Sequence, residues 1–132
     1  MTIFQKITEW NRERGLLGKE FNHEREVSFI VEELLESTGN HDSITARKKA
    51  EEIAHDIVTP EYFDEEKVID AFADIIVFSS GVIAKLGYSP DKVLEEVYKE
   101  IDSRKGKLVE GKFIKDPAAT LYHADFTDCK SN

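Results

Sequence analysis

The stretch that most constrains the fold runs from Glu65 to Leu86. It is rich in apolar residues at helical spacing, Asp64 can cap its start and Gly87 can end it. A helix of this length would span about 33 Å. When successive residues are placed about 100° apart, apolar side chains cover almost the whole circumference. Because such a helix is normally enclosed by others, we predict that it is central and buried.

One narrow polar stripe of this helix carries two carboxylates, Asp70 and Asp74. They lie one turn apart on the same side, with Cβ atoms about 6 Å apart, so their charges repel. Two interpretations remain open. Lys67 can neutralise Asp70 on a stripe that faces solvent. Alternatively, a divalent metal ion can bind here, provided that carboxylates from another helix face the stripe.

Length, charge and cysteine content exclude several classes of protein. The 132 residues, 40% of them hydrophobic, are enough for one domain with its own core. The net charge of -9 argues against nucleic acid or an anionic membrane surface as a partner. The single cysteine, Cys129, forms no internal disulfide, and the first residues do not resemble a signal peptide. We therefore expect a cytoplasmic protein with no membrane partner.

A second amphipathic helix, predicted over residues 23–38, carries more carboxylates. Its apolar stripe follows helical spacing and consists of Val27, Ile30, Val31, Leu34 and Leu35. The opposite side carries Glu32, Glu33 and Glu36, and such a run often forms a solvated face. Phe29 stands in the middle of this acidic face, one turn before Glu33. We interpret the aromatic ring as a sign that the acidic face is also covered.

The rest of the chain up to residue 104 is also predicted to be helical. Three further helices follow from apolar spacing and capping residues, over residues 2–14, 43–58 and 90–104. Since no strand pattern of useful length precedes residue 105, we predict an all-α fold. It would be a multi-helix bundle of four to five helices with an irregular C-terminal tail. The whole chain, 1–132, would form one domain, with the bundle over about 2–104 and a basic loop and tail over 105–132.

The segment that begins at residue 104 is locally basic in an otherwise acidic protein. Five cations fall within twelve positions: Arg104, Lys105, Lys107, Lys112 and Lys115. Gly106 and Gly111 favour a loop or a short hairpin, with a possible turn over residues 109–112. This can be an ordinary charged loop, or it can bind phosphate groups.

Together these segments predict a metal site. If the two acidic helices face one another, Glu33, Glu36, Asp70 and Asp74 would converge, with Glu32 beside them. Such a site would hold one or two Mg²⁺ ions, or Mn²⁺, because these ions prefer oxygen ligands. A metal ion beside a basic loop suits a reaction on polyphosphate, since both neutralise the charge that develops on the leaving group.

At this point the sequence resembles a known family. The motif Glu-Glu-x-x-Glu at residues 32–36, followed by Asp-x-x-x-Asp-Ile-Ile-Val at residues 70–77, is similar to motifs of the all-α nucleoside triphosphate pyrophosphohydrolases. These include the MazG-like enzymes, phosphoribosyl-ATP pyrophosphohydrolase and the dimeric dUTPases. The resemblance covers roughly residues 25–107. It implies an enzyme that hydrolyses a nucleoside triphosphate between the α and β phosphates, and a homodimer or homotetramer.

The resemblance also implies roles for particular residues. The catalytic or metal-binding carboxylates would be Glu32, Glu33, Glu36, Asp70 and Asp74, with Glu32 as a ligand neighbour or as the base that orients the attacking water. The second family motif is usually Glu-x-x-Asp, which would place a glutamate at Ala71, and Asp70 resembles a variant of that motif.

Substrate-binding residues are expected in two places. Arg104, Lys105 and Lys107 would bind phosphate, and Phe29 would contact the nucleotide. Other candidates for a base pocket are Trp10, Asn22 and His23.

Two other functions remain as alternatives. One is a non-catalytic helical interaction module. The other is a di-metal carboxylate bundle of other function, for which Glu52 and His55 supply only one of the two Glu-x-x-His pairs required.

Overall fold

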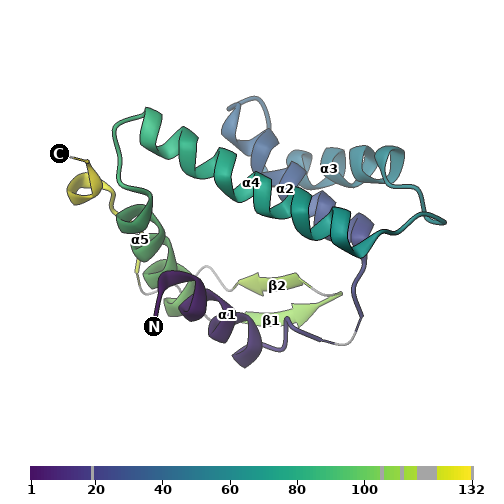
Figure 1. Cartoon of the computed structure of the whole chain (residues 1–132), viewed down its shortest axis with the longest axis horizontal. Helices are drawn as coiled ribbons and strands as arrows, with labels where there is room; N and C mark the ends of the chain where they lie inside the picture. The colour runs from purple at the N-terminus through teal and green to yellow at the C-terminus, as the bar shows by residue number, and fades with distance from the viewer. Residues whose placement is uncertain (19, 105, 111, 116–121, 132) are drawn as a thin grey trace. The chain divides into compact units, whose positions relative to one another are not determined.

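A computed structural model describes residues 1–132 except 19, 105, 111, 116–121 and 132, and gives only the backbone of residues 106–108, 112, 113 and 115. The elements shown in Figure 1 follow one another along the chain as α1 (Ile3–Glu13), α2 (His23–Ser37), α3 (Ser43–Ile57), α4 (Glu65–Lys85), α5 (Pro90–Ser103), β1 (Gly106–Val109), β2 (Lys112–Lys115) and the short 3-10 helix η2 (Thr127–Cys129). The predicted fold class, all-α with several helices, is confirmed. The basic segment forms the short antiparallel hairpin β1–β2.

The helices begin and end where the sequence predicts. Asp64 accepts a hydrogen bond from the backbone of Lys67 at the start of α4. Gly87, with a φ of 91°, adopts the left-handed conformation that ends this helix. Ser89 caps α5, whose first residue is Pro90. These signals act within one helical turn, which is why the sequence alone locates them.

The chain divides into two compact units, Glu20–Ile69 and Met1–Lys19 with Asp70–Asn132, and the division falls inside α4. Each unit is described by itself. In Glu20–Ile69, α2 packs against α3. Three alanines of α3, Ala46, Ala50 and Ala54, are fully buried. In α2 the buried residues are Ser28 and Glu32.

This packing corrects the predicted orientation of α2. The apolar stripe was expected to face inward, yet Leu34 is 60% exposed, while Ser28 and Glu32 are 3% and 8% exposed. In α3, where apolar spacing places Ala46, Ala50 and Ile57 on one side, the two alanines are buried but Ile57 is 63% exposed. Small side chains on α3 leave room for polar groups of α2. On the acidic side of α2, which Phe29 indicated to be covered, Glu32 is buried while Glu33 is exposed.

In the other unit α1 packs against α5. The Trp10 indole donates a hydrogen bond to the carbonyl of Ile101, 3.2 Å away, and Lys6 forms an ion pair with Glu95 at 3.1 Å. The end of the chain also attaches here. The Ser89 N–H donates to the carbonyl of Cys129, and the Ser131 N–H donates to the carbonyl of Gly87. The tail is thereby held at the turn that joins α4 to α5.

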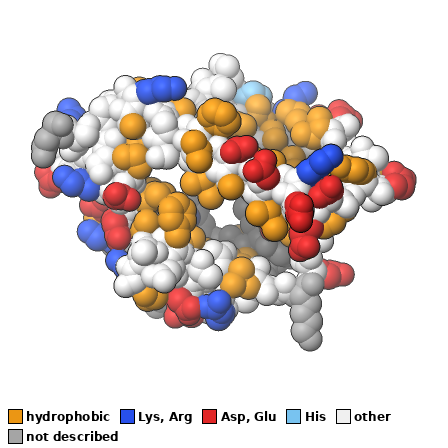
Figure 2. All heavy atoms as spheres, viewed as in Figure 1, with side chains coloured by type: hydrophobic (Ala, Val, Ile, Leu, Met, Phe, Trp, Pro, Cys, Tyr) orange, Lys and Arg blue, Asp and Glu red, His pale blue; other side chains and the backbone are white. Residues whose placement is uncertain are grey.

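Helix α4 differs most from expectation. No residue of α4 is buried, so the prediction of a buried central helix is wrong for the single chain. The apolar residues that are half or more exposed are Ile69, Ile76, Val77, Phe78, Val82 and, just after the helix, Leu86. Apolar side chains are visible at the surface in Figure 2. Periodicity reports which faces avoid water but not what covers them. No described helix is long and apolar enough to cross a membrane.

Candidate metal centre

Three glutamates of α2, Glu32, Glu33 and Glu36, gather into one cluster, which we call the acidic triplet. Each contributes a carboxylate oxygen, and these oxygens lie within 4.8 Å of one another. Helical spacing explains the grouping, because neighbouring residues and residues three or four apart lie close together on a helix. Glu32 is buried, Glu36 is partly buried and Glu33 is exposed. The triplet therefore has one side within the protein and one side open to solvent.

The buried member of the triplet is held by a cation from α3. An Arg47 nitrogen lies 2.8 Å from Oε1 of Glu32, and the guanidinium also donates to the Ser28 hydroxyl. Arg47 forms a second ion pair with Glu51 at 3.0 Å. Its guanidinium lies 5.2 Å from the ring centroid of Phe29. A carboxylate can be buried at low cost only when it is paired in this way.

Arg47 is the residue of this site that the sequence reasoning missed. A signal was available, because Arg47 follows the buried Ala46 and precedes Glu51 by one turn, a favourable spacing for an ion pair. What the sequence could not supply was the pairing of α3 with the acidic side of α2. Phe29 was expected to contact a nucleotide, and its ring lies against Arg47.

The donor set fits a hard divalent cation. Only carboxylate oxygens are present in the triplet, and Arg47 pairs with Glu32. Mg²⁺ and Mn²⁺ prefer oxygen ligands, and Mg²⁺ is commonly bound through one or two carboxylates. Glu33 and Glu36 therefore offer a suitable pair of ligands.

The second acidic motif lies on the part of α4 that belongs to the other unit. Asp70 and Asp74 are both exposed. Lys67, the predicted neutralising cation, donates from its ammonium to the Tyr62 hydroxyl at 3.2 Å. The structure thus brings Glu32, Glu33 and Glu36 together, while the convergence of Asp70 and Asp74 with them stays a prediction.

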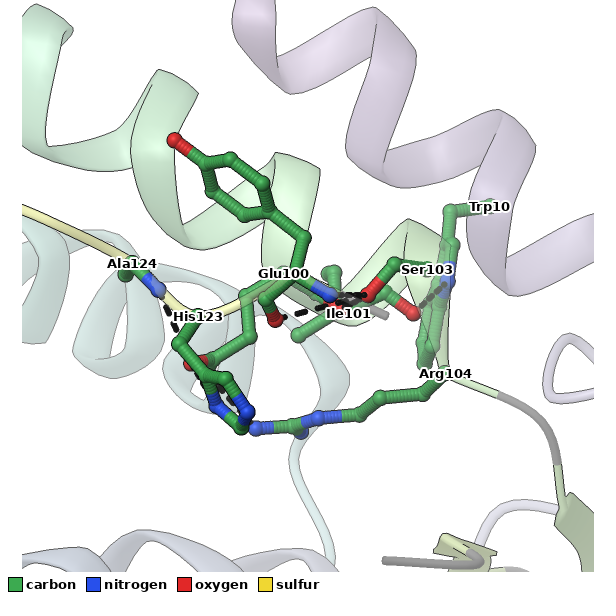
Figure 3. A network of polar contacts seen from close by, with 8 residues as sticks. Trp10, Glu100, Ile101, Ser103, Arg104, His123 and Ala124 are labelled. Atoms are coloured by element: carbon green, nitrogen blue, oxygen red, sulfur yellow. Dashed lines mark hydrogen bonds and ion pairs between the residues drawn. The ribbon is translucent and has the colours of Figure 1, made fainter. Parts of the chain in front are cut away.

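The predicted phosphate-binding cations have different surroundings. Arg104 forms an ion pair with Glu100 at 2.8 Å and belongs to the polar network drawn in Figure 3. In the same network Glu100 accepts a hydrogen bond from the backbone of Ala124 at 3.0 Å. Lys105 lies outside the described residues. The backbone of Lys107 lies in β1, and its side chain is also outside the described part.

The Glu-x-x-His pair considered for a di-metal bundle lies on α3. Glu52 and His55 are exposed, and Nδ1 of His55 lies 3.4 Å from a carboxylate oxygen of Glu24 on α2. The contact gives His55 a structural role, because it links α3 to α2 at the protein surface.

Comparison with known proteins adds no relative: no protein-family model matches the chain, and neither a curated protein nor a solved structure does.

Proposed function

We propose that the chain is a magnesium-dependent nucleoside triphosphate pyrophosphohydrolase, of the kind that its two acidic motifs resemble. The observation that carries the proposal is the acidic triplet, whose carboxylate oxygens lie within 4.8 Å of one another on one helix. The substrate would be a ribo- or deoxyribonucleoside triphosphate or a related nucleotide, and the products a monophosphate and pyrophosphate. A cytoplasmic location belongs to the same proposal.

The metal ligands would be Glu33 and Glu36, together with Asp74 and with Asp70 in place of the glutamate absent at Ala71. Mg²⁺, or Mn²⁺, would supply neutralisation of phosphate charge in this site. The two motifs would have to approach one another for all four carboxylates to share the ion. The exposure of Glu33, Asp70 and Asp74 is consistent with ligands that a cation can reach.

Glu32 would orient and deprotonate the attacking water. Arg47 binds Oε1 of Glu32 at 2.8 Å, which fixes the orientation of the carboxylate. The Glu32 carboxylate would accept the proton while the water oxygen forms a bond to the α phosphorus. The bond between this phosphorus and the oxygen that bridges to the β phosphorus would break, and pyrophosphate would leave with the electron pair. A base held in place in this way contributes by orientation as well as by basicity.

Arg104, Lys105 and Lys107 would neutralise the charge on the departing pyrophosphate. Arg104 is already paired with Glu100, so its contribution would require that this pair open or that it act at a distance. The proposal therefore relies on the lysines of the hairpin region more than on Arg104.

A homodimer or homotetramer is part of the proposal. Its support is the exposed apolar surface of α4, on which Val77 and Phe78 are 65% and 74% exposed. Burial of apolar surface is the main driving force of subunit association. A second copy of the chain would cover this surface and could bring a second acidic motif to each site.

The test is a screen of nucleoside triphosphates with Mg²⁺, followed by identification of the products. We expect a monophosphate and pyrophosphate in equal amounts, and no release of single phosphate. A melting scan gives an independent readout, because Mg²⁺ at about a hundred times its dissociation constant should stabilise the fold by roughly 2.7 kcal/mol. EDTA should reverse this stabilisation.

The non-catalytic interaction module remains the second candidate, and the exposed apolar surface of α4 also favours it. A module of this kind would show no turnover and the same melting midpoint in EDTA and in Mg²⁺. A di-metal bundle of other function would bind metal but leave all nucleotides intact.

A further inference from the structure

A cavity of about 660 Å³ opens within the unit Glu20–Ile69. Its walls come from residues 20–24, around the start of α2, and from residues within 58–65, the segment between α3 and α4. Cavities of this volume typically take small-molecule ligands. Two of its lining residues, Asn22 and His23, are among the candidates that the sequence suggested for a base pocket.

Aromatic rings from both segments line the cavity. The ring centroids of Phe21 and Phe63 are 5.7 Å apart, and His23 completes a group of three with centroid distances of 6.1 Å to Phe21 and 5.9 Å to Phe63. Phe21 and Phe63 are nevertheless 57% and 54% exposed. Large aromatic surfaces that stay exposed at a cavity are suited to stack on a planar ligand.

The polar groups of the cavity are unusual for an anion site. Three carboxylates, Glu20, Glu24 and Glu65, line it. They would repel a phosphate group but accept hydrogen bonds from an amino group. The Nδ1 atom of His23 is buried and has no hydrogen-bond partner among the described residues. Because this atom has no accessible surface, a ligand would meet the His23 ring rather than Nδ1, and the ring adds to the aromatic wall beside Phe21 and Phe63.

We infer that this cavity binds the base of the substrate nucleotide, and that it favours bases with an exocyclic amino group. Phe21 and Phe63 would stack on the planar base. The carboxylates would accept hydrogen bonds from its amino group, and the His23 ring would extend the aromatic surface. Cytosine and adenine meet this description, whereas uracil has no amino group.

The inference rests on the proposed function and extends it to the substrate class. Helix α2 connects the cavity to the acidic triplet, since it begins at His23 and carries Glu33 further along. With a rise of about 1.5 Å per residue, Glu24 and Glu33 are about 13 Å apart along the axis. One nucleotide could therefore place its base at the start of α2 and its phosphates towards the triplet.

The experiment measures nucleoside binding without metal or phosphate, so that it is independent of hydrolysis. The full-length chain in EDTA is titrated with cytidine, adenosine and uridine, and binding is followed by ligand-observed NMR. We expect cytidine and adenosine to bind about tenfold more tightly than uridine, as one additional hydrogen bond allows. Phe21→Leu and Phe63→Leu should each weaken cytidine binding about tenfold, because leucine keeps apolar volume but cannot stack as a ring does.

Phe4→Leu is the matched control. Phe4 is 49% exposed in α1, outside the cavity, and this variant should bind cytidine as the unchanged protein does. In turnover with Mg²⁺, Phe21→Leu should raise KM and leave kcat unchanged, which loss of folding alone would not produce. Melting midpoints of the variants show whether each is folded.

The outcomes separate this inference from the proposed function. Cytidine binding without any nucleotide hydrolysis would support the cavity and overturn the hydrolase. Hydrolysis without nucleoside binding, or with KM unchanged in Phe21→Leu, would overturn the cavity as base site. Equal affinity for cytidine and uridine would overturn the amino-group preference. If Phe21→Leu changes the oligomeric state in solution and the unchanged protein does not bind cytidine, the rings belong to a contact between subunits and the inference fails.

Discussion

Two glutamate–arginine pairs at the same separation have different surroundings. Glu32 and Arg47 lie 2.8 Å apart in the unit Glu20–Ile69, and Glu100 and Arg104 lie 2.8 Å apart in the other unit. Glu32 has two further carboxylates close by, Glu33 and Glu36, and one oxygen of each of the three lies within 4.8 Å of the others.

Glu100 instead accepts a hydrogen bond from the backbone N–H of Ala124, and Nδ1 of His123 lies 3.9 Å from the same carboxylate oxygen. The Glu100 carboxylate is thus paired with Arg104 of the same region and with the backbone of Ala124, and the second contact joins the tail to α5 (Figure 3). The comparison shows that an ion pair by itself does not mark a functional site. A place where several carboxylates gather around one ion pair is the better candidate for a cation site.

The largest effect is expected from the loss of Arg47. Arg47→Met should lower the free energy of unfolding by about 3 kcal/mol, because Glu32 would remain buried without a cation. Urea denaturation measures this change. The double variant Arg47→Met with Glu32→Gln should recover most of the stability. If it does not, the loss comes from packing of the long side chain rather than from the charge.

Glu36→Gln tests whether the triplet binds a metal ion. Glutamine keeps the shape and the helix propensity but is a weaker ligand for Mg²⁺. We expect at least about a hundredfold lower turnover, which corresponds to about 2.7 kcal/mol of transition-state stabilisation, with an unchanged circular dichroism spectrum. The matched control is Glu52→Gln, an exposed glutamate of α3. Full turnover in Glu36→Gln would remove this residue from the metal site.

Asp70→Asn asks whether a carboxylate of the other unit acts together with the triplet. If Asp70 is a metal ligand, turnover with Mg²⁺ should fall at least about tenfold, or about 1.4 kcal/mol. Without metal, the melting midpoint of Asp70→Asn should equal or exceed that of the unchanged protein, because the repulsion between Asp70 and Asp74 is removed. A lower metal-free midpoint together with normal turnover would make Asp70 structural.

Glu100→Gln should have a smaller effect of a different kind. It weakens the pair with Arg104 but keeps an acceptor for the Ala124 backbone, so we expect a loss of about 1 kcal/mol in stability. Turnover should stay within about twofold, because Glu100 pairs with Arg104 and is not one of the proposed metal ligands. Limited proteolysis of the tail measures the loosening. A large loss of turnover would place the Glu100 network in the reaction.

The smallest effect near neutral pH is expected from the ionisation of Tyr122 in the tail, which appears only in alkaline solution. The Tyr122 hydroxyl donates a hydrogen bond to Glu96, which raises the pKa of Tyr122 to about 12. The unfolded chain has the ordinary tyrosine value of about 10. The folded state therefore favours the protonated phenol, and this stabilisation is complete below pH 10 and is lost as the pH rises to about 12. Tyrosinate absorbance should show one group titrating near 12, which Tyr122→Phe removes. Its persistence in Tyr122→Phe would contradict the assignment.

Local features of the fold could be predicted from the sequence. Asp64, Ser89 and Gly87 bound helices as expected, because capping and left-handed termination act within one turn. The acidic triplet was predictable for the same reason, since a helix alone places residues 32, 33 and 36 close together.

Only the tertiary structure decided which surfaces meet. Arg47 reaches Glu32 because α3 packs against α2 on the side that carries Ser28 and Glu32. Phe29 indicated that this side is covered, but the sequence did not show which helix covers it. The cavity at Phe21 and Phe63 joins segments that are about forty residues apart, so no local pattern could indicate it. Periodicity also made α4 a buried helix, whereas the single chain leaves its apolar residues exposed. Local spacing fixes what a helix can present, but the free energy of packing over the whole chain selects the face that is covered.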